Sequence, residues 1–217
     1  MIFTSMKVSS YGGEYSFFTE DGTRYTLSAA DAKRLGLSEL SKDDLPVEFV
    51  DDETIVFLSS KLSAIKYCTY FLSFSDKSVS MLKRKMREKG YSEFVADEAL
   101  KVLGNSGFTN DSELCIKKYS SIAKTKLYGP YRIKQELIDK GFRDEDIRNA
   151  QAECDIDFEE ILEKLIQKLA RTSKVDFSDR NSLQKFKAKL SRYGYGFETI
   201  NAVMSSLCHD DTFYGED

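Results

Sequence analysis

The sequence predicts a mainly α-helical protein in which three tandem three-helix repeats form an elongated array, preceded by a small N-terminal β-hairpin module. Three observations predict it. Only two of the 217 residues are proline, Pro46 and Pro130, so few positions interrupt a helical hydrogen-bond ladder. One helix-ending pattern occurs three times at nearly constant spacing. A tight-turn pair, Asp21-Gly22, separates two aromatic-rich segments near the N-terminus.

The N-terminal segment predicts strands. Residues 15–19 and 23–27 are rich in aromatic and β-branched side chains, and the Asp-Gly pair between them favours the positive φ angles of a hairpin turn. Residues 2–8 are a candidate third strand, because an isolated hairpin is marginal in water. Residues 28–36 read as a short helix with a serine cap and a terminal glycine. The acidic connector at 43–53 has no assigned structure.

The repeated pattern is an apolar residue, three others, a second apolar residue, three others, then glycine and an aromatic residue. This frame occupies residues 82–91, 133–142 and 186–195, and its glycines lie 51 and 53 residues apart. Gly90, Gly141 and Gly194 are each expected just past a helix end, where a left-handed conformation penalises a side chain. The aromatics after them, Tyr91, Phe142 and Tyr195, would pack back on the helix; a base-stacking series is the less favoured alternative.

Each frame has a helical pattern before it and after it. The preceding helices are expected at 62–74, 111–126 and 158–169, where apolar residues recur at spacings of three and four, and the following ones at 94–103, 146–152 and 198–207. Pro130 falls in a first helical turn, where a missing N–H is tolerated. The predicted organisation is a hairpin module with its acidic connector at 1–60, then repeats at 61–107, 108–155 and 156–217.

Charge is unevenly distributed along the chain. The net charge is −4, yet residues 61–150 carry 18 Lys/Arg against 12 Asp/Glu, and both flanks are acidic. The same frame position holds a lysine in all three repeats, and the first frame adds further cations. The candidate partner-binding residues, which include the arginine after Pro130, are Lys83, Arg84, Lys85, Arg87, Lys89, Arg132, Lys134 and Lys187. Such cations could contact successive sites of a repetitive partner, or they could form an ordinary solvated helix face.

Other side chains argue against catalysis. The four cysteines, Cys68, Cys115, Cys154 and Cys208, form no Cys-x-x-Cys pair and read as core thiols of a reducing compartment. His209 is the only histidine, which disfavours a histidine-based metal site or triad, and no glycine-rich phosphate loop occurs. We therefore expect a non-enzymatic protein without cofactor, metal or catalytic residues. We also expect it to lack a signal peptide and a membrane span and to be cytoplasmic.

Several motifs together resemble the RecX family, the regulators of the bacterial RecA recombinase. The residues that carry the resemblance are Lys89-Gly90-Tyr91, the segments 107–111 and 128–137, and Lys140-Gly141. The segment 128–137 is similar to the family signature Tyr-Gly-Pro-x-Arg-Ile-x-x-Glu-Leu. Departures are Thr109 and Asn110, where the family usually has Leu and Asp, and a third repeat that keeps only the generic frame.

The resemblance implies a function. Such a protein would bind RecA and its filament on single-stranded DNA and would inhibit filament extension, ATP hydrolysis and strand exchange, with roles in recombination, DNA repair and the SOS response. The alternative is a stand-alone nucleic-acid-binding helical repeat module, and weak direct DNA binding is compatible with both. Since tandem repeats already supply repeated contacts within one chain, we expect a monomer.

Overall fold

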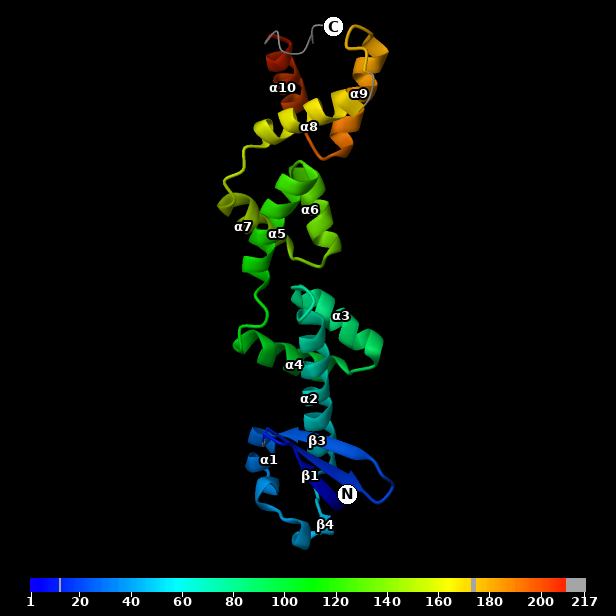
Figure 1. Ribbon diagram of the computed structural model, residues 1–217, viewed down its shortest axis with the longest axis vertical. Helices are drawn as coiled ribbons and strands as arrows, with labels where there is room; N and C mark the ends of the chain where they lie inside the picture. Colours follow the sequence, from blue (N-terminus) through cyan, green and yellow to red (C-terminus); the bar gives the residue numbers. More distant parts are fainter. Residues whose placement is uncertain (12, 173–174, 210–217) are drawn as a thin grey trace. The chain divides into compact units, whose positions relative to one another are not determined.

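The computed structural model describes residues 1–11, 13–172 and 175–209. The chain divides into two compact units, Met1–Asn110 and Asp111–Asp217. Helices dominate both units, and the strands of the described residues form one small sheet in the first (Figure 1). The predicted class, mainly α with an N-terminal β module, is thereby confirmed. No helix among the described residues is long and apolar enough to cross a membrane.

The first unit opens with a four-stranded antiparallel sheet in the order β3-β2-β1-β4. Its strands are β1 (Ile2–Val8), β2 (Glu14–Thr19), β3 (Arg24–Ser28) and β4 (Val47–Glu48). Gly22, in the β2–β3 turn, has φ of 81°. The hairpin and its third strand are confirmed, whereas β4 was not predicted, because two residues are too few to show an alternating pattern.

A short helical region connects β3 to β4. Helix α1 (Ala29–Arg34) begins after Ser28, whose Oγ accepts the Asp31 N–H at 3.1 Å, a serine cap of the predicted kind. Two 3-10 turns follow, η1 (Leu37–Glu39) and η2 (Lys42–Asp44). Most of the segment left unassigned from the sequence is therefore ordered by turns and by pairing with β1.

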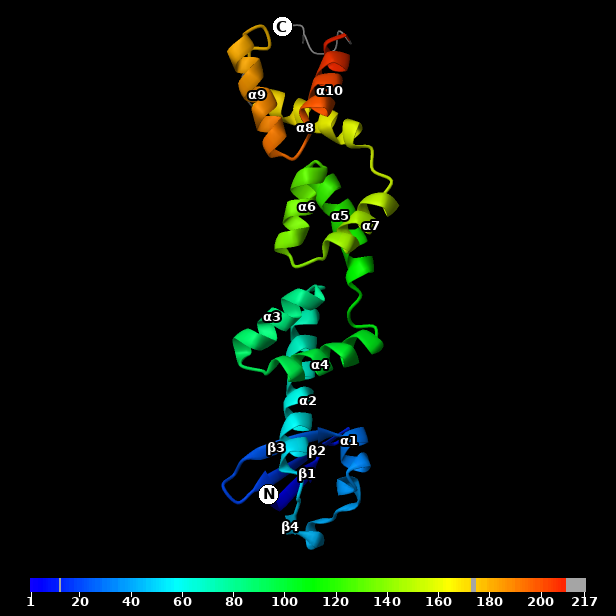
Figure 2. The ribbon, with the colours of Figure 1, turned by 180° about the vertical axis from the view of Figure 1, so that it is seen from behind.

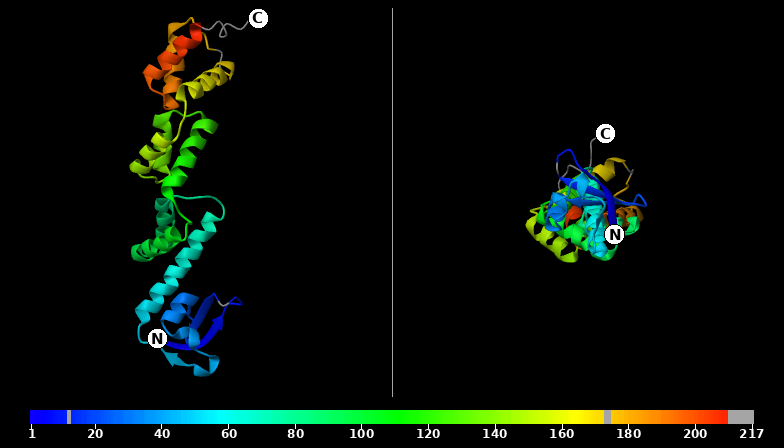
Figure 3. Two further views of the ribbon diagram at one scale, coloured as in Figure 1. Left: turned by 90° about the vertical axis from the view of Figure 1, so that its left-hand side faces the viewer. Right: turned by 90° about the horizontal axis from the view of Figure 1, so that it is seen from below.

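Helix α2 (Asp52–Leu72) is longer than the sequence predicts. The expected start at 62 is wrong, and the predicted boundary between 60 and 61 falls inside the helix. Asp51 caps it by accepting the Thr54 N–H at 3.0 Å. The first half of α2 contributes Ile55 and Leu58 to the core beneath the sheet. The second half of the helix extends past the sheet (Figure 3) and belongs to the first repeat.

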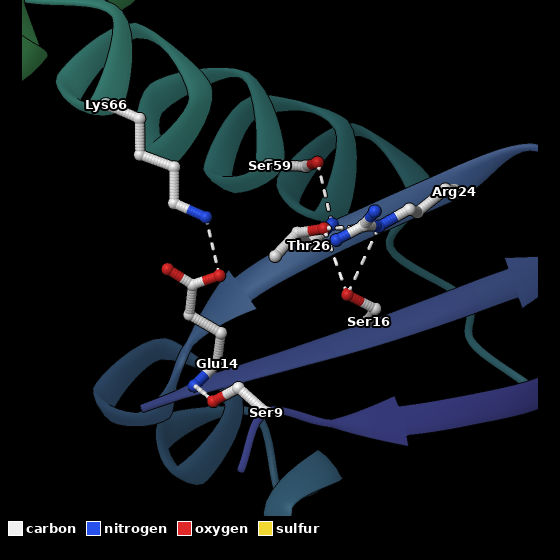
Figure 4. Close-up of polar contacts among 7 residues, drawn as sticks. All are labelled: Ser9, Glu14, Ser16, Arg24, Thr26, Ser59 and Lys66. Atoms are coloured by element: carbon white, nitrogen blue, oxygen red, sulfur yellow. Dashed lines mark hydrogen bonds and ion pairs between the residues drawn. The ribbon is translucent and has the colours of Figure 1, made fainter. Parts of the chain in front are cut away.

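Polar contacts also fasten the sheet to α2 (Figure 4). The Thr26 N–H on β3 donates to Ser59 Oγ at 2.9 Å, and the Lys66 ammonium lies 2.5 Å from the Glu14 carboxylate on β2. The hydrogen bond satisfies an N–H on the outer edge of the sheet, which would otherwise be available for pairing. The sheet and the first repeat therefore share one continuous helix.

The first repeat is completed by α3 (Val79–Lys89) and α4 (Glu93–Asn105). Ala64 and Cys68 of α2 pack against Leu82 and Met86 of α3 and against the apolar face of α4. The N-terminal module has its own core around Phe3, Phe17 and Leu27, and Phe57 of α2 borders both cores.

The second unit contains the other two repeats. They are built from α5 (Asp111–Lys126), α6 (Pro130–Asp139) and α7 (Asp144–Glu153), then α8 (Phe158–Thr172), α9 (Arg180–Arg192) and α10 (Phe197–His209). Both repeats contribute to a single buried cluster, and α10 packs on α8 and α9 (Figure 2). Repeats 2 and 3 therefore bury their apolar faces together, as tandem helical units do.

The three frame glycines have the predicted left-handed conformation, with φ of 97° at Gly90, 82° at Gly141 and 95° at Gly194. In the first two frames the N–H of the next aromatic residue donates across the cap, from Tyr91 to Met86 O and from Phe142 to Leu137 O, both at 3.1 Å. Tyr195, in the third frame, is also buried. Core packing of these rings is thus favoured over base stacking.

Candidate partner-binding surface

The frame lysine of repeat 1 is paired within the molecule. The Lys83 Nζ on α3 lies 2.6 Å from an Asp97 carboxylate oxygen and 3.0 Å from a Glu93 carboxylate oxygen, both on α4. Hydrogen bonds to Asp97 and then to Glu93 raise the pKa of Lys83. The ammonium therefore joins the second and third helices of its repeat and stays charged at neutral pH.

The equivalent lysines repeat this contact. The Lys134 Nζ on α6 lies 2.5 Å from an Asp144 carboxylate oxygen on α7, and Lys187 Nζ on α9 donates to Asn201 Oδ1 on α10 at 2.7 Å. The hydrogen bond from Lys134 lowers the pKa of Asp144. The sequence shows that the three lysines recur, but only the structure gives the reason: each links helix two of its repeat to helix three.

The other cations of α3 differ in how many contacts they make within the molecule. The Lys85 Nζ lies 3.4 Å from Glu88 and 5.9 Å from the centroid of the Phe71 ring. Within the described part of the chain, Arg84 makes one long contact, to Glu88 at 3.8 Å. Arg87 and Lys89 are exposed and have no side-chain partner among the described residues. The unpaired positive charge of the first frame therefore lies at the C-terminal end of α3.

Arg132 belongs to a cluster around the aromatic residue of the signature segment. Its guanidinium carbon lies 5.7 Å from the centroid of the Tyr128 ring, and Lys126 Nζ lies 5.6 Å from it. The Lys126 ammonium also lies 2.6 Å from Glu136, which Lys140 contacts at 3.0 Å. Burial by itself would raise the pKa of Glu136, but hydrogen bonds from the two lysines outweigh it and hold that pKa below its usual value.

The signature segment is also the joint between repeats 2 and 3. Gly129 N–H donates to Tyr193 O at 2.8 Å, and Tyr131 N–H donates to Gly194 O at 3.3 Å. Tyr195 Oη donates to Leu127 O at 3.1 Å. A Cβ on Gly129 would lie 2.4 Å from Gly194 O, so any other residue there would force backbone atoms to shift.

Pro130 completes the joint, since it occupies the first turn of α6, directly after the Gly129 cap. The sequence explained this Gly-Pro pair as a turn that opens a helix. The sequence does not indicate that this Gly-Pro pair contacts the third frame, because Gly129 and Gly194 are 65 positions apart and no local pattern connects them.

Exposed aromatic side chains that the sequence did not single out lie in the first turns of three helices, one in the first unit and two in the second. Tyr131 at the start of α6 and Phe197 at the start of α10 keep 73% and 58% of their surface accessible. They border one open pocket with Lys134 and Glu198. In the first unit Phe94 is 65% exposed and packs against Phe57 with ring centroids 5.0 Å apart and the ring planes tilted by 36°. Phe94 and Phe197 lie in the first turn of a helix that follows a frame, whereas Tyr131 lies in the first turn of the helix that carries the second frame.

The described cysteines are poor nucleophiles. Burial raises the pKa of Cys68 to about 11 and is the main cause that raises that of Cys115 to about 12. Burial also raises the pKa of Cys154, which is half-buried. Among the described residues no three His, Cys, Asp or Glu side chains lie close enough to hold a metal ion. Cys208 and His209 lie outside the side chains that the structure describes.

Known proteins resemble this chain in sequence and in fold. Residues 64–103 match the family model described as RecX, first three-helix domain. The regulatory protein RecX of Pseudomonas savastanoi pv. phaseolicola is 34% identical over 131 residues, which are 60% of this chain and 82% of that protein. The regulatory protein RecX of Leuconostoc mesenteroides is 26% identical over 207 residues, which are 94% of this chain and 75% of that protein.

Solved structures share the fold. A crystal structure of a regulatory protein RecX superposes with a TM-score of 0.74 at 19% identity and covers 94% of this chain and 100% of its own. That of RecX from Lactobacillus salivarius gives a TM-score of 0.61 at 23% identity and covers 68% of this chain and 96% of its own. With a relative 34% identical over most of its length, the chain belongs to the RecX family of regulatory proteins.

Proposed function

We propose that this chain binds the RecA recombinase and its filament on single-stranded DNA, and that it inhibits filament extension, ATP hydrolysis and strand exchange. The observation that carries the proposal is membership of the RecX regulatory family, supported by a match in the first repeat. RecA would thus be the partner, and regulation would proceed by binding without chemistry of its own. The buried thiols of Cys68 and Cys115 suit such a role.

The helical repeats suit a repetitive partner. Each repeat presents its second helix with cations on it, and contacts that are weak singly add up when several are made at once. We assign the principal contact to the C-terminal end of α3, where Arg87 and Lys89 are exposed and have no side-chain partner among the described residues. Arg84, Lys85 and Arg132 are secondary contacts, because each is partly engaged within the molecule.

The frame lysines contribute to the proposed surface differently from the exposed cations of α3. Lys83, Lys134 and Lys187 are held by acceptors on the next helix, so an external partner must compete with that pairing or accept a further hydrogen bond beside it. We propose that they contribute mainly by holding helix two of each repeat in position. Their replacement should then affect stability as well as binding.

The test is RecA ATP hydrolysis on single-stranded DNA at near-physiological salt, with the purified chain titrated in and its DNA binding measured separately without RecA. We expect hydrolysis to fall at concentrations well below that of RecA. The double variant Arg87→Glu/Lys89→Glu should need at least about tenfold more protein, as expected when a multivalent contact loses one site. The control Lys124→Glu/Lys168→Glu changes net charge equally, at exposed positions outside the proposed surface, and should inhibit like the wild type.

The outcomes separate the two candidate functions. No effect on RecA together with DNA binding that weakens steeply as salt rises would identify a nucleic-acid-binding module, because such binding depends on counterion release. Equal inhibition by both double variants would remove α3 from the contact but leave the regulatory role standing.

A further inference from the structure

The N-terminal sheet has an edge that its own strands leave open. The short strand β4 pairs with β1 only at Ile2 and Phe3. On its other side β1 pairs with β2 from Phe3 to Val8, with a shift in register between Phe3 and Ser5. Among the described residues, therefore, β1 has a neighbouring strand on one side only from Ser5 to Val8, and the backbone groups there that point the other way meet no strand.

The backbone direction at this edge follows from the pairing. The Ser9 N–H donates to Glu14 O at 2.9 Å, at the end of β1 where Figure 4 also shows Ser9 Oγ accepting the Glu14 N–H. Residues of an antiparallel strand alternate between the two edges, so Lys7 and Ser9 turn their backbone groups towards β2. Met6 and Val8 consequently direct their N–H and C=O groups to the open edge. These groups have no backbone partner there among the described residues.

A groove follows this open edge. It has a volume of about 800 Å³ and is lined by residues 4–8 of β1 on one side and by Leu40, Ser41, Lys42 and Leu45 on the other. Leu40 and Leu45 are half-buried, and Met6 is buried, so the floor of the groove is apolar. Space beside an unpaired strand edge is the geometry into which an extended peptide adds as a further strand.

The charges that line the groove indicate which kind of peptide it would bind. The module has 5 Lys/Arg against 11 Asp/Glu in residues 1–60, yet the described lining contains Lys7 and Lys42 and no carboxylate. The nearby Asp44 carboxylate is occupied, because it accepts the Ser41 N–H and hydroxyl, both at 2.7 Å. Lys7 is exposed on the solvent face with its Nζ 5.7 Å from the Phe18 ring centroid, whereas Met6 faces the core. An added strand would meet positive charge on one face and apolar side chains on the other.

Charge disfavours a second copy of the chain in one register at this edge. Two β1 strands that pair in the antiparallel register with Met6 opposite Val8 would bring the two Lys7 residues directly opposite each other, and like charges at that position are destabilising. An acidic strand has the reverse effect, because a carboxylate opposite Lys7 gains a favourable cross-strand pair.

We propose that the open edge of β1 binds an extended acidic segment of a protein partner by strand addition, with the segment's backbone paired to Met6 and Val8. Its carboxylates lie beside Lys7 and Lys42, and its alternate apolar side chains face Met6, Leu40 and Leu45. This site lies on the N-terminal module and does not depend on the cationic end of α3.

The probe is a fluorescein-labelled peptide of about eight residues that alternates valine and glutamate, long enough to cover the open edge. Binding to the full chain is followed by fluorescence anisotropy, and amide hydrogen exchange is followed by NMR. We expect saturable binding that slows exchange at Met6 and Val8. The same peptide with glutamine in place of glutamate should bind at least about tenfold more weakly, because it loses its pairing with the two lysines.

Two variants and one control test the backbone and the charge separately. Val8→Pro removes an outward N–H and should weaken binding at least about tenfold, while Val8→Ala keeps the N–H and should bind within about twofold of the wild type. Lys7→Glu should also weaken binding about tenfold without touching the backbone, and it keeps the test decisive if Val8→Pro fails to fold.

Three results would overturn the proposal. They are absence of binding at about 1 mM peptide, equal binding of the glutamine peptide, and unchanged binding by folded Val8→Pro. A dimer in sedimentation that Val8→Pro dissociates would assign the edge to a second copy instead.

Discussion

Replacing Gly129 by alanine tests the joint between repeats 2 and 3. The added Cβ would lie 2.4 Å from Gly194 O, 2.6 Å from Gly194 C and 2.9 Å from Tyr195 Cγ. Two of these atoms belong to the backbone, which cannot rotate away as a flexible side chain does. Gly129 itself has φ of −78° and ψ of 170°, which alanine adopts readily, so the expected effect comes from the contact and not from backbone strain.

The magnitude follows from two ways of relieving the clash. Shifted backbone in a packed site costs about 1–3 kcal/mol. Opening the joint instead breaks up to three hydrogen bonds, at about 1 kcal/mol each: those from Gly129, Tyr131 and the Tyr195 hydroxyl. Alanine recovers about 0.4–1 kcal/mol by restricting the unfolded chain. The net loss is about 2 kcal/mol, which lowers the Tm of a chain of this size by about 4–8 °C.

The assay is thermal unfolding of the full chain followed by circular dichroism and calorimetry, with Gly104→Ala as the matched control. Gly104 lies inside α4, and a Cβ there meets only Thr109 Oγ1 at 3.7 Å, an ordinary contact. Alanine should therefore stabilise that helix by up to about 1 kcal/mol. A Gly129→Ala chain as stable as the wild type would refute the reasoning.

Three further predictions concern charge, pH and thiols. Lys83→Ala should lower the Tm at low salt and much less at about 1 M NaCl, because salt screens its ion pairs. The control Lys168→Ala removes no ion pair among the described residues, so its effect on the Tm should not depend on salt. Equal salt dependence of the two variants would exclude a stabilising ion pair between Lys83 and α4. In the folded chain the pKa of Glu136 lies below its ordinary 4.5, so the ionised carboxylate stabilises the fold above about pH 4.5, and this stabilisation is lost as the pH falls through the folded pKa. The difference in Tm between the wild type and Glu136→Gln should therefore shrink in acid. A difference that stays constant with pH would contradict this. Iodoacetamide at about pH 8 should leave Cys68 and Cys115 unmodified in the folded chain and should label both in guanidinium, as mass spectrometry would show. Rapid labelling of the folded chain would mean that the two cysteines are accessible thiolates.

The sequence determined the repeats because their signals are local. A helix end with glycine and an aromatic residue requires only a few consecutive side chains, so the pattern alone places Gly90, Gly141 and Gly194 at helix ends. The Asp-Gly turn at Gly22 is equally local. The start of α2 was misjudged because polar and acidic residues around Asp52 resemble a connector, although Ile55 and Leu58 are needed in the core under the sheet.

Tertiary structure alone decided which side chains have partners. The lysine of each frame looked like a free cation in the sequence, and only the packing of helix two on helix three places Asp97 beside Lys83 and Asp144 beside Lys134. The requirement for Gly129 likewise comes from a carbonyl at Gly194, far along the chain. Short-range patterns fix helices and turns, because their hydrogen bonds close within a few residues, whereas charge pairing and close approach depend on residues that only folding brings together.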